Sequence, residues 1–90
     1  MTERDDLIAG FLDHHGWGNA ARSVLAADAS FRGYYRLADG DRRAVLMDAP
    51  PPKEDVRSFV AIARHLLKLG LSAPEVYAED AAAGLLLLED

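Results

Sequence analysis

The segment from Leu25 to Leu37 holds the residues of this chain best suited to bind an anion. Its first half is rich in small side chains, which allow backbone N–H groups to approach a phosphate closely: Ala26, Ala27, Ala29 and Ser30. The Ser30 hydroxyl would add a hydrogen bond, and the Arg32 guanidinium a charge-assisted one. An ordinary tight turn flanked by surface arginines explains the same residues, and on these features alone that simpler interpretation is favoured.

Other common catalytic chemistries find little support in the sequence. No cysteine is present, which excludes thiolate nucleophiles, thiolate metal sites and disulfides. His14 and His15 are adjacent and would project about 100° apart on a helix, which suits the negative end of a helix dipole better than a shared metal ion. His65 belongs to the polar face of a second expected helix. No serine lies in a G-x-S-x-G motif, and neither G-x-x-x-x-G-K-[ST] nor G-x-G-x-x-G occurs.

The hydrophobic pattern predicts the elements that position the first half of the chain. They are a short amphipathic helix (5–14), a segment ambiguous between helix and strand but favouring a strand (20–26), an aromatic-rich strand (31–37) and an apolar strand (43–48). Asp39-Gly40 is typical of the tight turn of a hairpin between the last two. Because residues 44–47 are apolar at consecutive positions, both faces of the returning strand are expected to be covered.

The second half opens with the proline triplet 50–52, interpreted as a rigid spacer rather than a ligand for an aromatic groove. The expected elements are then a long helix (53–69), a strand (76–78), a turn (80–84) and a strand (85–88). The helix carries one apolar stripe: Val56, Phe59, Val60, Ala63, Leu66 and Leu67. The predicted fold class is α+β: an antiparallel sheet of about five strands with one long packed helix, a short N-terminal helix, and both helices on one side.

Charge and hydropathy exclude several function classes. Ten Lys and Arg against fifteen Asp and Glu give a net charge of −5, which argues against a general nucleic-acid or anionic-membrane binder. The longest aliphatic run, 85–88, is far too short to cross a bilayer, and the acidic first residues are unlike a secretory signal. We therefore expect a cytoplasmic protein. The chain stops at Asp90, inside a strand-like run, and we expect it to be part of something larger.

Four blocks of sequence are more distinctive than any single motif. They are Leu25 with DASFR (28–32) and YYR (34–36), then AVLMDAPP (44–51), GLSAPEV (70–76) and GLLLLED (84–90). In this order they resemble the start of the aminoglycoside phosphotransferase family, and are closest to its bacterial branch of anomeric N-acetylmuramate and N-acetylglucosamine kinases. The resemblance covers nearly the whole chain from about Leu7. It implies a protein-kinase-like fold, in which a small nucleotide-binding lobe precedes a larger substrate lobe.

The resemblance implies that residues 1–90 are the nucleotide-binding lobe and that the larger lobe follows. Residues 27–31 would cover the triphosphate of ATP, 53–69 would be the helix packed on the sheet, and 87–90 would enter the hinge that holds the adenine. The implied nucleotide-binding residues are Asp28, Ala29, Ser30, Phe31, Arg32, Val45, Met47, Leu88, Glu89 and Asp90. Catalytic residues and magnesium ligands are expected in the larger lobe. The acceptor would be a hydroxyl of an amino sugar or aminoglycoside-like molecule, and this lobe alone would be inactive.

One departure from the kinase pattern bears on mechanism. Protein kinases pair a third-strand lysine, which steadies the α- and β-phosphates, with a helix glutamate. Met47 occupies the lysine's place here, and the centre of the helix has no acidic residue; Arg32 or Arg43 would have to substitute. Two other interpretations stay open. One is a non-catalytic module that docks through the long helix and an open 85–88 strand, and the other is a pseudokinase lobe, prompted by Met47.

Overall fold

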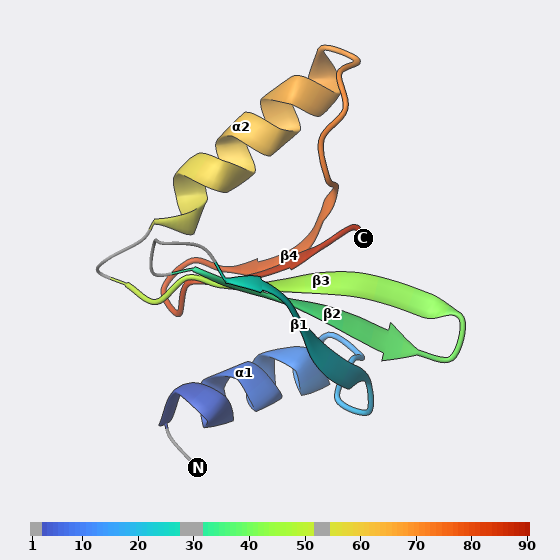
Figure 1. Cartoon of the computed structure of the whole chain (residues 1–90). Coiled ribbons are helices and arrows are strands. Elements are labelled where there is room, and N and C mark those ends of the chain that lie inside the picture. Colours follow the sequence, from blue (N-terminus) through green and yellow to red (C-terminus); the bar gives the residue numbers. More distant parts are fainter. Residues whose placement is uncertain (1–2, 28–31, 52–54) are drawn as a thin grey trace.

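The computed structural model describes residues 3–27, 32–51 and 55–90. The described part contains two helices and five strands (Figure 1). They are α1 (Glu3–His14), β1 (Ala21–Ala27), β2 (Gly33–Asp39), β3 (Arg42–Asp48), α2 (Val56–Lys68), β4 (Val76–Asp80) and β5 (Leu85–Leu88). The α+β class is confirmed, and the ambiguous segment 20–26 is largely a strand. The predicted strand at 31–37 is displaced by two residues, to 33–39.

The five strands form one antiparallel sheet in the order β1-β2-β3-β5-β4. The last strand therefore lies inside the sheet, with Leu88 opposite Val45 of β3 and Val76 of β4. All four residues of β5 are buried. The expectation of an open strand at 85–88 is wrong, because both edges of this short apolar strand are hydrogen-bonded to neighbours within the sheet.

Each face of the sheet is covered by one helix. On the α1 side, Leu46 and Leu87 join a core with Phe11 of the helix. On the other side, Met47 and Leu86 join a separate core with residues of α2. Figure 1 shows the sheet lying between the two helices. The prediction that both helices lie on one side is wrong: β3 and β5 are apolar at consecutive positions, so both faces of the sheet need cover.

Helix α2 begins and ends at residues suited to those places. The Asp55 carboxylate caps it by accepting a hydrogen bond from the Arg57 amide at 3.0 Å. After Lys68 the chain turns at Gly70, whose φ of +79° suits glycine. The expected start at residue 53 lies outside the described residues, and within them the helix begins at Val56.

The apolar stripe of α2 meets the sheet only in its first half. Val56, Val60 and Ala63 are buried, whereas Leu67 is 41% exposed. In Figure 1 the C-terminal half of the helix rises away from the sheet. The predicted packing of the stripe is therefore confirmed for its first two turns, and its last turn leaves apolar side chains uncovered.

The turn between β4 and β5 contacts the segment that follows β3. The Ala49 amide donates to the Gly84 carbonyl at 2.8 Å, and Gly84 has a φ of +71°. A Cβ atom at Gly84 would lie only 2.0 Å from the Ala49 carbonyl oxygen. Only glycine fits here, since both the backbone conformation and the close approach exclude a side chain.

Replacing this glycine should destabilise the fold sharply. We expect Gly84→Ala to lower the free energy of unfolding by about 3 kcal/mol, from left-handed backbone strain and the clash with Ala49. Gly10→Ala is the matched control: Gly10 is exposed within α1 with no atom within 4 Å of the added Cβ, and alanine should stabilise the helix by about 0.5–1 kcal/mol. Urea denaturation measures both, and equal effects of the two substitutions would contradict the close approach.

Candidate nucleotide site

Three of the implied nucleotide-binding residues come together on the α2 side of the sheet. Val45 and Met47 are two residues apart on β3, so they face the same side. Leu88 of β5 lies directly opposite Val45. All three belong to the core that includes Val56 and Val60 of α2. All three are buried, and together they form an apolar cluster at the middle of the sheet.

The implied phosphate-covering residues Asp28, Ala29, Ser30 and Phe31 lie outside the described residues, so their role stays a prediction. The ends that they connect are described. Ala27 pairs with Gly33, and Gly33 pairs with Asp48, the residue after Met47. The β1–β2 connection therefore joins the sheet at the end of the strands where Met47 lies. Arg32 immediately precedes β2 at this end and is partly buried.

The two residues after β5 are held by different neighbours. The Glu89 amide donates to the Glu75 carbonyl at 2.8 Å, and the Glu75 amide donates to Glu89 Oε1 at 3.2 Å. The Asp90 carboxylate accepts hydrogen bonds from Arg36 of β2. A hollow of about 530 Å³ opens beside both residues, bounded on its other sides by Leu67 and the segment 72–74.

The structure separates Arg32 and Arg43, the two arginines expected to replace the third-strand lysine. Arg43 Nη1 donates to the carbonyl oxygens of Gly40 at 2.8 Å and Arg42 at 3.0 Å, at the β2–β3 turn. That turn is at the opposite end of the strands from the β1–β2 connection. Arg43 therefore cannot take the place of a lysine at Met47, and of the two only Arg32 lies at the required end. Helix α2 contains no acidic residue along Val56–Lys68, so it offers no partner for a lysine.

The Asp48 side chain forms an ion pair with Arg4 on the α1 side of the sheet. Arg4 Nε donates to Asp48 Oδ1 at 2.8 Å, and the same guanidinium donates to the carbonyls of Ala83 and Gly84. The two side chains are 24% and 15% exposed. This contact ties the start of α1 to β3 and to the β4–β5 turn. Sequence reasoning missed it, although an arginine in the first turn of a helix, where the dipole disfavours it, is a signal that it has another partner.

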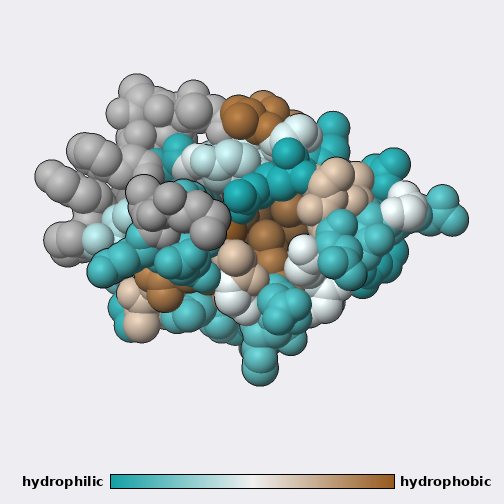
Figure 2. Space-filling model, turned by 90° about the horizontal axis from the view of Figure 1, so that it is seen from below, coloured by the Kyte–Doolittle hydropathy of each residue, from teal (hydrophilic) through white to brown (hydrophobic). Residues whose placement is uncertain are grey.

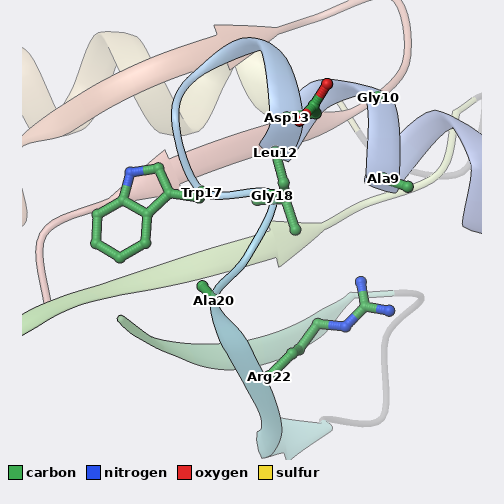
Figure 3. A pocket seen from close by; sticks show the side chains of 8 residues that line it. All are labelled: Ala9, Gly10, Leu12, Asp13, Trp17, Gly18, Ala20 and Arg22. Carbon is green, nitrogen blue, oxygen red and sulfur yellow. The ribbon is translucent and has the colours of Figure 1, made fainter. Parts of the chain in front are cut away.

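The α1 side of the molecule has a hollow of its own. It encloses about 540 Å³ between α1 and β1. Figure 3 shows Arg22 of β1 reaching toward Ala9 and Gly10 of α1 across this space. Figure 2, which views the same side of the molecule, shows a hollow with a hydrophobic floor among largely hydrophilic side chains. It lies on the opposite face of the sheet from Val45 and Met47.

Within residues 3–27, 32–51 and 55–90, no group of three or more His, Cys, Asp or Glu side chains could hold a metal ion. Neither helix of this part of the chain is long and apolar enough to cross a membrane. His14 and His15 contact each other edge to face, with ring centroids 4.8 Å apart.

Comparison with known proteins identifies the family. The profile of the phosphotransferase enzyme family (APH) matches residues 22–89, which include all five strands except the first residue of β1. The chain belongs to this family. Its sheet and its packed helix are consistent with the small lobe of the kinase-like fold that the sequence resemblance implies.

Three curated proteins are similar to this chain, and each is named N-acetylmuramate/N-acetylglucosamine kinase. The protein of Pseudomonas aeruginosa is 47% identical over 89 residues, which are 96% of this chain and 26% of that protein. The Caulobacter vibrioides protein is 37% identical (99% of this chain, 32% of that protein), and the Pseudomonas putida protein 38% (96% and 26%). The chain thus spans between a quarter and a third of the length of these relatives.

The Arg4–Asp48 pair should contribute to stability more than the exposed pairs do. We expect Arg4→Met to lower the free energy of unfolding by about 1–3 kcal/mol, because the part-buried Asp48 carboxylate and the Gly84 carbonyl lose donors. Arg57→Met removes the arginine of the exposed Asp55–Arg57 pair and should change the free energy of unfolding by less than about 0.5 kcal/mol. Equal shifts in a denaturation experiment would refute a structural role of Arg4.

Proposed function

We propose that residues 1–90 are the nucleotide-binding lobe of an ATP-dependent phosphotransferase. The observation that carries this proposal is the placement of Val45, Met47 and Leu88 on one face of a sheet within the family match. Apolar side chains at the middle of the sheet suit the flat apolar faces of a purine. The β1–β2 connection begins at the Met47 end and the hinge residues follow Leu88. Base and phosphates would then lie at different points along the same strands.

The hydrogen bonds after β5 suggest how the base would be recognised. The Glu89 amide already donates to the Glu75 carbonyl, so it is engaged. The Glu89 carbonyl would accept a hydrogen bond from the exocyclic amino group of adenine. An amino purine fits this acceptor better than a purine with a carbonyl at the same position, since two acceptors cannot pair.

The work of this lobe is to orient ATP rather than to make or break bonds. Transfer of the γ-phosphoryl group depends mainly on in-line positioning and on neutralising charge. Arg32 would supply a cation near the phosphates at the end of the sheet where Met47 stands in place of lysine. In this proposal the Mg²⁺ ligands and the catalytic residues belong to the larger lobe that the family resemblance implies.

The acceptor in this proposal is a hydroxyl of an amino sugar. The three relatives support it, since each is named a kinase of N-acetylmuramate and N-acetylglucosamine. A cytoplasmic location agrees with the use of ATP. The net charge of −5 offers no general attraction to nucleic acid or to anionic membranes.

A non-catalytic docking role for the long helix is the second candidate. The last turn of α2 and the segment after it expose apolar side chains, with Leu69 60% and Leu71 54% exposed. Such a surface suits a protein partner. A pseudokinase lobe, which would bind nucleotide without transferring phosphate, is the variant that Met47 suggests. Nucleotide binding and phosphoryl transfer together distinguish these roles.

Hydrogen–deuterium exchange with ATP tests the proposal, using the protein expressed from its complete gene. Saturating ATP should slow amide exchange in residues 27–31 and 87–90, the implied phosphate-covering and hinge segments. The α1 helix, on the far face of the sheet, is the internal control and should be unaffected. Absence of any ATP-dependent protection would refute the nucleotide site, and protection without phosphorylation of an amino sugar would favour the pseudokinase.

A pair of arginine substitutions tests how the missing lysine is replaced. Arg32→Ala should weaken ATP binding about ten- to a hundredfold, the value of one charge-assisted hydrogen bond to phosphate. Arg43→Ala should change affinity less than twofold, because Arg43 lies at the other end of the strands. Isothermal titration calorimetry measures both. Unchanged affinity in Arg32→Ala would end the assignment of this residue to the phosphates.

A further inference from the structure

An ion pair joins the segment after β5 to a strand that is not its neighbour. Arg36 Nε donates to Asp90 Oδ2 at 2.9 Å, and Arg36 Nη2 donates to Asp90 Oδ1 at 3.2 Å. Both carboxylate oxygens accept a hydrogen bond, so the contact is bidentate. Arg36 belongs to β2, and β3 lies between β2 and β5 in the sheet. The pair therefore spans the width of β3.

Two residues in register with Arg36 on the neighbouring strands belong to the candidate nucleotide site. Arg36 lies opposite Val45 of β3, and Val45 lies opposite Leu88 of β5. Residues directly opposite one another in a sheet share a face, so the Arg36 side chain starts on the same face as these two. Val45 is only 8% exposed. Arg36 is therefore next to the buried apolar cluster that is proposed to contact the base.

The geometry of this pair matters more than its contribution to stability. The Arg36 and Asp90 side chains are 48% and 23% exposed. Ion pairs between solvent-exposed side chains contribute little to folding stability. A planar guanidinium that engages both carboxylate oxygens nevertheless fixes the position and orientation of the acid. Asp90 is consequently held in a defined place at little gain in folding free energy.

We infer that Arg36 is a positioning residue for nucleotide binding, acting through Asp90; this inference rests on the nucleotide-binding role proposed above. On the β4 side, Glu75 holds Glu89 through the two hydrogen bonds described. On the β2 side, Arg36 holds Asp90. The two anchors together set the path of residues 89–90, whose backbone would meet the edge of the base. Lysine could not replace arginine in this contact, because only a guanidinium donates to both carboxylate oxygens at once.

A double-mutant cycle in the protein expressed from its complete gene tests this inference. Arg36→Met and Asp90→Ala should each raise the Kd for ATP about tenfold, and the double variant should be no worse than either, because both remove the same contact. Arg36→Lys keeps the charge but not the bidentate contact, and its Kd for ATP should resemble that of Arg36→Met. The KM of the acceptor sugar should change less than twofold, as should the Kd in the control Arg64→Met, which removes the exposed Arg64–Glu79 pair.

The outcomes separate this inference from the proposed function. Wild-type affinity for ATP in Arg36→Met overturns the inference and leaves the nucleotide site intact. Restored affinity in Arg36→Lys, or additive losses in the double variant, would also overturn it, because Arg36 would then act on the nucleotide by its charge rather than through Asp90. A wild-type protein that does not bind ATP overturns both.

Discussion

The pairing of two strands that are apolar on both faces determines the rest of this structure. Residues 45–48 of β3 pair with 88–85 of β5, and seven of these eight side chains are buried. Neither strand has a polar face that could be left to solvent, so the sheet must be covered twice. Helix α1 covers one face and α2 the other. The placement of the two helices on opposite faces follows from this central pair.

The same pairing separates structural from functional residues along β3. Met47 and Asp48 are adjacent in sequence, yet they point to opposite faces because side chains alternate along a strand. Asp48 is bound by Arg4 of α1 and stabilises the fold. Met47 lies in the α2 core and is one of the residues of the candidate nucleotide site. An acidic residue next to the expected lysine position suggests a catalytic role. Asp48 cannot take such a role on the proposed nucleotide face, because its side chain points to the opposite face of the sheet.

Features determined by neighbouring residues were predictable, and those determined by distant ones were not. The 3.6-residue period of α2, the turns at Gly40 and Gly84 and the apolar strands all follow from short-range patterns. The central place of β5 depends on which strands pair, which no local pattern reveals. The Arg4–Asp48 and Arg36–Asp90 contacts join residues 44 and 54 positions apart. The candidate site itself came from family resemblance, since its key side chains are apolar and carry no chemical signal of their own.

The absence of a lysine–glutamate pair changes how α2 is held against the sheet. In protein kinases that ion pair links the helix to the strand and to the phosphates at once. Here α2 is placed by the packing of Val56 and Val60 against the core that contains Met47, and by the Asp55 cap. Apolar packing does not depend on a phosphate group for its stability. The helix is therefore held against the sheet without such an ion pair, and under the proposed function the charge of the triphosphate would be neutralised by cations outside β3.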